Sequence, residues 1–369
     1  MRYVPLGLGL LFAAGTLGFH RWSFSPTGQA GWQRIDRPVG LAPRGLAFTE
    51  LTGQGPALAV ADAASNDLRI LPLADGGGFG PPLQLPTALG PFEILAGRLE
   101  RDGRPDLVVP NRGMGSVSIF RESDGGTFGP RTDVPVGIAP TAVAVADFDG
   151  DGRLDLAVAD PGEGALVLLL GRGGGRFDEV SRVPLPPGAW DLAAADFNGD
   201  GRVDIAIADP LFGGVAIFLN RGKGRFALPV EHAAGLFPQA LTVADLDGDG
   251  HPDLVVTNGR MNSVTVLRGD GRGGFSSPTS YLAGLYPSFI AVADLDGDGK
   301  PDLAVTNGGS QTVSILRGLG GGRFGPPQNL EVGLSPSCVV VRDLDGDGRP
   351  DLIVANAGSN SLTVLMQRP

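Results

Sequence analysis

The stretch ADLDGDGHPDLVVTNG, residues 244–259, places four aspartates within nine residues and follows them at once with an apolar run. Carboxylates this close repel one another unless a positive charge lies among them. The same acidic pattern begins at Asp147, Asp196, Asp245, Asp294 and Asp343, each 49 residues after the one before. A turn that recurs at a fixed period of this length indicates a repeat protein.

Two weaker copies precede these five. Counting back from Asp147 reaches Arg98 in RLERDGRPD and then Glu50 in ELTGQGPAL, which is one residue short of the period. A phenylalanine at 79, 128, 177, 226, 275 and 324 confirms the register. Seven repeats account for 343 of the 369 residues and leave 26 at the N-terminus.

Each repeat contains four short apolar runs bounded by Gly, Pro, Asp and Asn, which are typical strand boundaries. In one repeat the runs are 140–148, 154–160, 165–171 and 176–185. Four strands per repeat predict an all-β, seven-bladed β-propeller over residues 27–369. The last repeat stops after its third strand, 361–367, so we expect the N-terminal segment 32–40 to supply the fourth strand and close the ring.

Composition restricts the function. The formal net charge is −11 and no basic run occurs, so nucleic acid is excluded as an expected partner. The single cysteine, Cys338, excludes an internal disulfide. Three histidines, His20, His232 and His251, argue against a histidine triad or a zinc site.

The N-terminus reads differently from the repeats. Arg2 precedes an apolar stretch that is short for a membrane span and typical of a signal peptide. We therefore expect residues 1–26 to be a signal peptide, or an uncleaved anchor, and the protein to be extracytoplasmic: secreted, periplasmic or surface-anchored. Membrane attachment is expected only where this segment stays uncleaved.

The acidic loop suits a hard cation. Carboxylates at loop positions 1, 3, 5 and 9 and the backbone carbonyl at position 7 supply the oxygens that Ca²⁺ prefers. Asx-rich hairpin turns are the alternative interpretation, but such turns need fewer aspartates. The sequence thus predicts about five calcium ions. The expected ligand residues are Asp147, Asp149, Asp151, Arg153, Asp155, Asp196, Asn198, Asp200, Arg202, Asp204, Asp245, Asp247, Asp249, His251, Asp253, Asp294, Asp296, Asp298, Lys300, Asp302, Asp343, Asp345, Asp347, Arg349 and Asp351.

With these motifs the chain resembles the FG-GAP/VCBS repeat family, whose repeats also build the propeller of integrin α-subunits. The resemblance is carried by ADFDGDGRLDLAVAD, ADLDGDGKPDLAVTN and RDLDGDGRPDLIVAN, and by FGPP at 79–82 and 324–327. It implies a calcium-stabilised propeller, usually extracellular and often adhesive or ligand-binding. The first two loops depart from the family pattern, and we expect them to bind no calcium. In the second, we expect Arg98 to pair with Glu100, Asp102 and Asp106 in place of the ion; the alternative interpretation is sequence drift, with Arg98 pointing into solvent.

The connections between blades vary most and are expected at the face opposite the acidic loops. Phe92, Trp190, Phe237 and Tyr286 are predicted to gather there as a ligand-binding surface, although they equally suit a plug of the channel mouth. An Asp or Asn also ends the second strand of every repeat, at 62, 111, 160, 209, 258, 307 and 356. An Asx turn is the favoured interpretation of these positions, and a ring of polar ligands is the other.

These observations favour a non-catalytic binding or adhesion module with an unknown protein or glycan ligand. An extracellular enzyme, a lyase or hydrolase, and a calcium-dependent lectin are the alternatives, both using the face of the blade connections.

Overall fold

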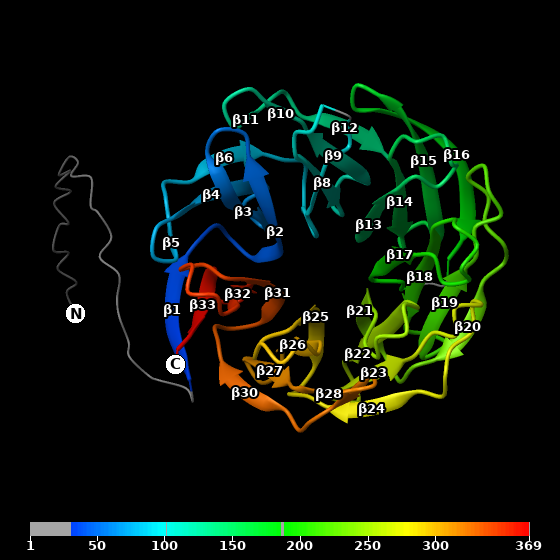
Figure 1. Cartoon of the computed structure of the whole chain (residues 1–369). Helices are drawn as coiled ribbons and strands as arrows, with labels where there is room; N and C mark the ends of the chain where they lie inside the picture. The colour runs from blue at the N-terminus through cyan, green and yellow to red at the C-terminus, as the bar shows by residue number, and fades with distance from the viewer. Residues whose placement is uncertain (1–30, 101, 186–187, 369) are drawn as a thin grey trace, which may run out of the picture.

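The computed structural model describes residues 31–100, 102–185 and 188–368, and these residues form seven small antiparallel sheets around a central channel (Figure 1). The predicted leader, residues 1–26, lies outside the described residues. Among the described residues no helix is long and apolar enough to cross a membrane. The predicted all-β, seven-bladed propeller is confirmed.

Each blade has four strands, and in blades 1 to 6 they follow the chain order from the channel outward. Blades 1 to 3 consist of β2 (Pro43–Leu51), β3 (Gly55–Asp62), β4 (Asp67–Ala74) and β6 (Leu83–Pro86); β7 (Leu95–Gly97), β8 (Asp106–Asn111), β9 (Ser116–Phe120) and β12 (Thr132–Pro135); and β13 (Ala142–Ala146), β14 (Asp155–Asp160), β15 (Ala165–Gly173) and β16 (Arg176–Pro184).

Blades 4 to 6 repeat this order. They consist of β17 (Leu192–Ala195), β18 (Asp204–Asp209), β19 (Gly214–Phe218) and β20 (Val230–Ala233); β21 (Pro238–Ala244), β22 (Asp253–Asn258), β23 (Ser263–Leu267) and β24 (Thr279–Leu282); and β25 (Pro287–Ala293), β26 (Asp302–Asn307), β27 (Thr312–Leu316) and β30 (Gln328–Glu331). Short outer pairs are β5 (Gly78–Phe79) on β4, β10 (Glu122–Ser123) with β11 (Thr127–Phe128), and β28 (Gly318–Gly320) with β29 (Arg323–Phe324).

Blade 7 joins the two ends of the chain. Its strands are β31 (Pro336–Arg342), β32 (Asp351–Asn356), β33 (Ser361–Gln367) and β1 (Trp32–Pro38). In Figure 1 the first strand lies beside the last, and the register pairs Trp32 with Gln367 and Pro38 with Ser361. Trp32 is buried between blades 6 and 7. The predicted closure by the N-terminal strand is therefore confirmed.

The core lies between neighbouring blades. The second strand of each blade from β8 onward is buried along its whole length, as in β14 and β18. Phenylalanines of the repeat marker add to this packing across blades: Phe226 contacts Phe148, and Phe275 contacts Phe197, edge to face at 6.0 and 5.8 Å between ring centroids. Apolar side chains thus fill the space between neighbouring blades.

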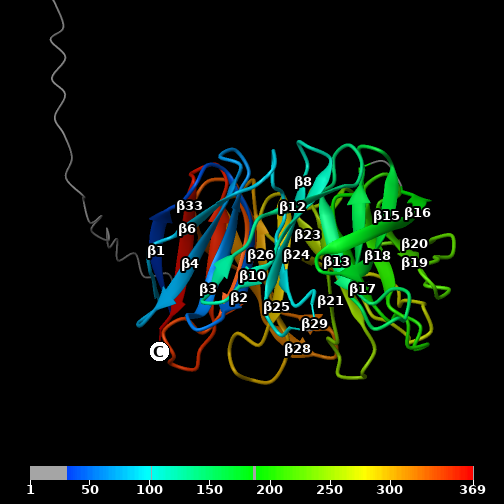
Figure 2. The ribbon, with the colours of Figure 1, turned by 90° about the horizontal axis from the view of Figure 1, so that it is seen from above.

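Strand register separates two faces of the ring. In blade 3, Ala146 pairs with Asp155 beside the acidic loop, and Ala142 pairs with Ala159 at the other end. Figure 2 views the ring edge-on, with the strands running from one face to the other. The acidic loops therefore lie on one face, called here the loop face. The connections between blades, with the turns after the second strands, lie on the other, called the channel face.

Candidate metal loops and channel face

The acidic loop is folded around its first aspartate. In blade 3, the side chain of Asp147 accepts the backbone N–H of Gly150 and Gly152 at 2.7 and 2.8 Å. Both glycines have a φ of 82°, which other residues rarely adopt. The first aspartates of blades 4 to 7 make the same two bonds. The loop sequence thus fixes a tight turn that directs its carboxylates inward.

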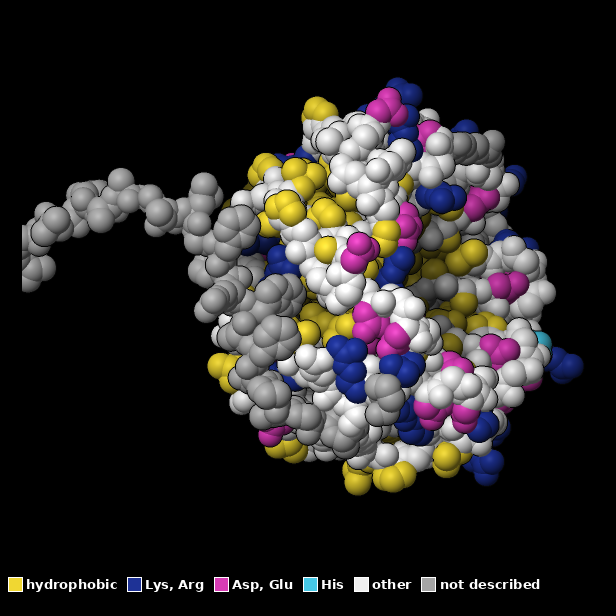
Figure 3. Space-filling model, turned by 60° about the vertical axis from the view of Figure 1, so that its left-hand side comes forward, with side chains coloured by type: hydrophobic (Ala, Val, Ile, Leu, Met, Phe, Trp, Pro, Cys, Tyr) yellow, Lys and Arg dark blue, Asp and Glu magenta, His cyan; other side chains and the backbone are white. Residues whose placement is uncertain are grey.

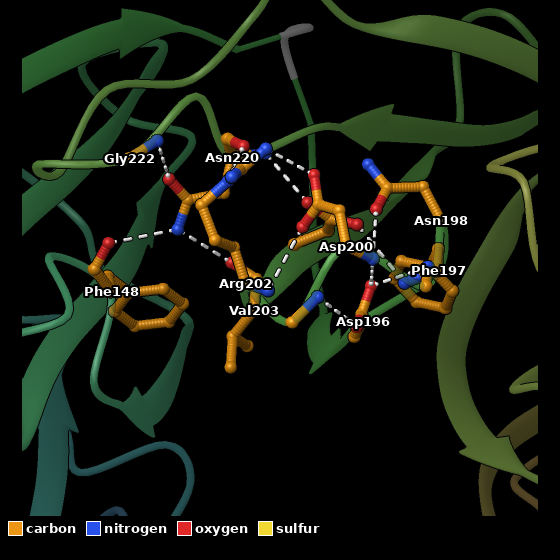
Figure 4. Close-up of polar contacts among 12 residues, drawn as sticks. Phe148, Asp196, Phe197, Asn198, Asp200, Arg202, Val203, Asn220 and Gly222 are labelled. Carbon is orange, nitrogen blue, oxygen red and sulfur yellow. Dashed lines mark hydrogen bonds and ion pairs between the residues drawn. The ribbon is translucent and has the colours of Figure 1, made fainter.

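Four of the five loops bring three carboxylates together with oxygens within 4.8 Å of one another. The groups are Asp147, Asp149 and Asp155; Asp245, Asp247 and Asp249; Asp294, Asp296 and Asp302; and Asp343, Asp345 and Asp347. The loop of blade 4 has Asn198 at position 3 instead (Figure 4). These acidic clusters can hold metal ions.

Two carboxylate oxygens test whether a cation fits. Oδ1 of Asp247 and Oδ1 of Asp345, both at position 3, are buried and accept no hydrogen bond among the described residues. A buried, unpartnered carboxylate oxygen is unfavourable because it has lost its water. A cation between positions 1, 3 and 5 satisfies it, and the donors are all hard oxygens. The residues present therefore fit a hard divalent cation.

Basic side chains neutralise part of each cluster. At position 7, Arg153, Arg202, Lys300 and Arg349 form ion pairs with the position-5 aspartate of their own loops. Neighbouring arginines approach position 3: Arg268–Asp247 at 3.6 Å, Arg317–Asp296 at 3.7 Å and Arg368–Asp345 at 3.0 Å. Figure 3 shows basic and acidic side chains interspersed on the surface. Position 7 was expected to contribute only its backbone carbonyl, so this pairing was not predicted, although four of the five loops carry Arg or Lys there.

Position 9 differs from the other carboxylates because it closes the hairpin. Asp155 is buried and accepts the backbone N–H of Phe148 and of Gly171, both at 2.8 Å. The aspartates at position 9 of blades 4 to 7 make the equivalent pair of bonds. Burial raises the pKa of Asp204 and of Asp351 to about 6. This residue is a structural element of the blade whether or not it also faces an ion.

Blade 4 also ties its loop to its neighbour. The side-chain amide of Asn220 donates to the carbonyl oxygen of Phe148 in blade 3, at 2.9 Å, and to that of Val203, at 3.0 Å. Arg202 donates to the carbonyl oxygen of Asn220 at 2.9 Å (Figure 4). The loops are therefore held by contacts between blades as well as within them.

Arg98 does not make the predicted internal ion pair. Glu100 accepts the N–H of Gly175 from blade 3 at 2.7 Å, and Asp106 accepts two backbone N–H groups. Among the described residues no ion pair joins Arg98 to the carboxylates of its own loop; it lines a cavity between blades 2 and 3, with Arg153. Backbone N–H groups already satisfy the carboxylates of Glu100 and Asp106, so these groups do not need Arg98 as a partner.

The Asp or Asn that ends each second strand is buried in every blade. Asn307 accepts the N–H of Gly284 at 3.0 Å and donates to Ser314 at 2.9 Å, and Asp160 accepts the N–H of Ile138 and Ala139. These bonds fasten the connection from the preceding blade. They agree with the turn interpretation and leave no ring of ligands facing the channel.

A cavity of about 510 Å³ opens at the channel face. Phe92, Trp190 and Tyr286 line it, whereas Phe237 is not among its lining residues and lies under Arg260, 4.4 Å from the guanidinium carbon to the ring centroid. Phe92 and Trp190 pack at 6.0 Å between centroids. The structure thus brings three of the four predicted ligand-binding aromatics together. It adds Arg112, which stacks over both Phe92 and Trp190 and which the sequence analysis missed.

Two carboxylates lie in the wall of this cavity. Glu93 accepts the N–H of Val143 at 3.2 Å, and Asp191 accepts that of Leu241 at 2.9 Å. Burial raises the pKa of Asp191 to about 6, and burial together with the charge of Asp191 raises the pKa of Glu93 well above its usual value. The thiol of Cys338, also in the wall, has its pKa raised by burial to about 12, so it is not a ready nucleophile.

The comparisons with known proteins agree with this geometry. No curated protein matches the chain. Among solved structures, BBS1N in complex with ARL6DN is similar with a TM-score of 0.64 and 15% identity, covering 92% of this chain and 98% of that one. A functionally unknown protein from Desulfotomaculum acetoxidans has a TM-score of 0.60 at 15% identity, covering 83% and 90%, and one from Lactobacillus plantarum 0.53 at 16%, covering 83% and 98%. At these identities the likeness shows the fold alone.

The repeats themselves match a family. FG-GAP-like repeats match residues 98–158, 147–207, 196–256, 245–305 and 294–354, in steps of one blade. These windows start at Arg98 and at four of the five acidic loops described above, and together they span most of the chain. The chain belongs to the FG-GAP repeat family.

Proposed function

We propose that this protein is an extracytoplasmic, calcium-stabilised propeller that acts by binding a ligand at its channel face. The fold supports a binding module, and a similar propeller, BBS1N, is in complex with a protein. The observation that carries the ligand site is the cavity of about 510 Å³ with aromatic walls. Ligand sites are typically concave and mostly apolar, with a few convergent polar groups.

The acidic loops carry the calcium part of the proposal. The expected ligands are the aspartates at positions 1, 3 and 5, with Asn198 in blade 4, together with position 9 and the carbonyl of position 7. The buried, partnerless oxygens of Asp247 and Asp345 support an ion in blades 5 and 7. When bound, the ion supplies positive charge that joins the two ends of the loop. The loop face and the cavity are separate, so calcium here stabilises the scaffold.

The experiment is a ligand screen of the calcium-loaded protein on a glycan array and by pull-down from extracytoplasmic fractions. Every retained ligand is tested again with Trp190→Ala and Tyr286→Ala. Because aromatic anchors at the centre of a binding site carry much of its affinity, we expect each variant to lose about tenfold or more. Leu228→Ala, an exposed residue away from the channel, is the matched control. Ligands retained equally by all variants would place the site elsewhere.

A further inference from the structure

Six of the seven blade connections expose an aliphatic side chain. The same repeat position, two residues before the proline that leads into the next blade, is 48% to 62% exposed in six connections: Leu41, Leu89, Ile138, Leu236, Leu285 and Leu334. The seventh position, Pro187, lies outside the described residues. Equivalent positions of a propeller repeat lie at one height along its axis. These six residues, called the rim, therefore form a level ring around the channel mouth.

The backbone at the rim positions is held by hydrogen bonds. The N–H of Leu285 donates to Ser310 at 3.1 Å and that of Leu334 to Ser359 at 3.1 Å, so turns of the neighbouring second strands fix the connection. The residue after the rim position has a left-handed backbone at Tyr286, with φ of 55°, and at Ser335, with φ of 51°. Non-glycine residues rarely adopt this conformation, and it persists where the surrounding structure fixes it.

The turns after the second strands extend the apolar surface. Met114, Leu211, Phe212 and Met261 are 57%, 71%, 51% and 47% exposed. They lie on the same face as the rim because their turns hydrogen-bond to the connections; Met261 receives the N–H of Leu236. A soluble protein rarely leaves so many large apolar side chains together on one face without a partner.

Three arginines lie at the mouth of the channel, and Glu93 and Asp191 lie in the wall of the cavity that opens there. Arg44, Arg112 and Arg260 stack on aromatic rings at the channel mouth, and none of them has an ion-pair partner among the described residues. The exposed acid in these turns, Glu163, is paired with Arg182. The acidic clusters lie at the opposite ends of the strands, on the loop face. The three arginines therefore supply exposed positive charge at the channel mouth, whereas the exposed acidic clusters lie on the loop face.

We propose that the channel face docks on an anionic phospholipid bilayer. The rim enters the interface, and Arg44, Arg112 and Arg260 reach the headgroup phosphates. A level, mainly leucine ring suits a flat apolar boundary, whereas leucine is under-represented among the hot spots of protein interfaces. A second copy fits less well, because a two-fold contact sets the arginines of one copy against those of the other. The acidic loop face then points to water.

This inference goes beyond the proposed function and does not depend on the ligand of the cavity. It also differs from the sequence-based expectation that only an uncleaved leader attaches the protein to a membrane. The leader precedes β1, whose first residue, Trp32, pairs with Gln367 at the loop-face end of the blade. The rim lies at the other end of that strand. The two contacts are therefore separable by mutation.

The test is co-sedimentation of the full chain with phosphatidylcholine vesicles, with and without phosphatidylglycerol. Leu236→Gln, Leu285→Gln and Leu334→Gln are combined in one variant. The control combines Leu83→Gln, Leu228→Gln and Leu319→Gln, which are exposed on outer strands and hairpins. We expect the rim variant to bind the mixed vesicles at least about tenfold more weakly than wild type, and the control to bind equally. All variants carry the same leader, so any contribution of the leader to vesicle binding cancels when their affinities are compared with that of wild type.

The charge contribution is measured separately. Combining Arg44→Gln, Arg112→Gln and Arg260→Gln is expected to weaken binding to the mixed vesicles about a hundredfold and to abolish its dependence on salt. The control combines Arg176→Gln, Arg225→Gln and Arg323→Gln, which share one repeat position in the outer hairpins. Brominated lipid is expected to quench Trp190, and the Trp190→Phe variant to lose that share of the quenching.

Three results would overturn the proposal. The first is wild-type protein that does not bind the mixed vesicles, or binds them as well after the rim substitutions. The second is equal loss in the outer-leucine control, which makes the effect one of general hydrophobicity. The third is a wild type that sediments as a dimer and a rim variant that sediments as a monomer, because the rim is then an interface between copies. The ligand screen of the cavity is carried out without vesicles and is read separately from these three results.

Discussion

The acidic loops of blades 2 and 3 have the same aspartate at position 9 but differ at position 1. Asp106 in blade 2 accepts two backbone N–H groups at 3.1 and 3.3 Å, and Asp155 in blade 3 accepts the equivalent pair at 2.8 Å each. Blade 3 then gathers Asp147 and Asp149 beside Asp155, whereas blade 2 has Arg98 at the first position. Both blades fold with the same strand order. The ninth position therefore serves the fold in both blades, whereas the clustered earlier positions of blade 3 are the ones that the proposed ion needs.

The largest expected effect tests this division at all five complete loops. Chelation leaves facing carboxylates without their counter-ion, so the stability contributed by binding is lost. At calcium ten times above Kd each site contributes about 1.4 kcal/mol, or about 7 kcal/mol for five. The melting temperature should fall by about 10 °C between millimolar calcium and excess EDTA. Equal melting temperatures in the two conditions would refute a structural role for calcium.

The next prediction compares position 9 with position 3 within the loop of blade 3. Asp155→Ala leaves two buried N–H groups unsatisfied and should cost about 2 to 4 kcal/mol of unfolding free energy with or without calcium. Asp149→Ala should cost about 1 kcal/mol or less in EDTA and more in calcium, when it also loses an ion ligand. Urea unfolding in both conditions measures this. Asp106→Ala is the matched variant in blade 2 and should behave like Asp155→Ala in EDTA.

If Asp149→Ala and Asp155→Ala are equally destabilising in EDTA, the division between fold and ion is wrong.

Much of the architecture follows from the sequence because the repeat supplies the same local signals seven times. The runs predicted at 140–148, 154–160, 165–171 and 176–185 correspond to β13 to β16 within a few residues. The missing fourth strand of the last repeat located β1, some 320 residues away in the chain, because an open blade edge is unfavourable. Both the repeat length and the unpaired edge of the last blade can be recognised directly in the sequence.

Side-chain contacts between blades could not be predicted from the sequence in the same way. Nothing local distinguishes Glu100, which bonds to Gly175 of the next blade, from a partner for Arg98. Phe237 shares its place in the connection with Tyr286, and both have a left-handed backbone, yet it lies outside the cavity beneath Arg260. These outcomes depend on which side chains of adjacent blades meet, and the period does not encode that.

The first blade offers a smaller, pH-dependent comparison at its other end. Asp62 stands where four other blades have Asn, and burial raises its pKa to about 7 despite the Arg69 ion pair at 3.0 Å. A carboxyl whose pKa is raised on folding stabilises below its unfolded pKa, and this contribution is lost as pH rises towards 7. Asp62→Asn removes that loss, so its stability relative to wild type should improve by on the order of 3 kcal/mol from about pH 4 to pH 8.

Urea unfolding of both proteins across this range measures the difference, and calcium binding elsewhere cancels because it is common to both. Two stability curves that stay parallel would show that Asp62 is charged throughout and that its ion pair outweighs its burial.

The smallest expected effect is the conversion of the loop of blade 2 into a calcium-binding loop like that of blade 3. Arg98→Asp restores a carboxylate at position 1 and places it with Glu100, Asp102 and Asp106 at the other ligand positions. Because Glu100 already accepts the N–H of Gly175, the ion must compete with that bond, and we expect the new site to be weaker than the five complete ones. Calorimetry should show the calcium stoichiometry rising by one. Arg176→Asp, which adds the same charge in the same cavity outside the loop, should add no ion. A sixth ion already present in the wild type, or no gain in the variant, would mean that the first position does not decide whether a loop binds.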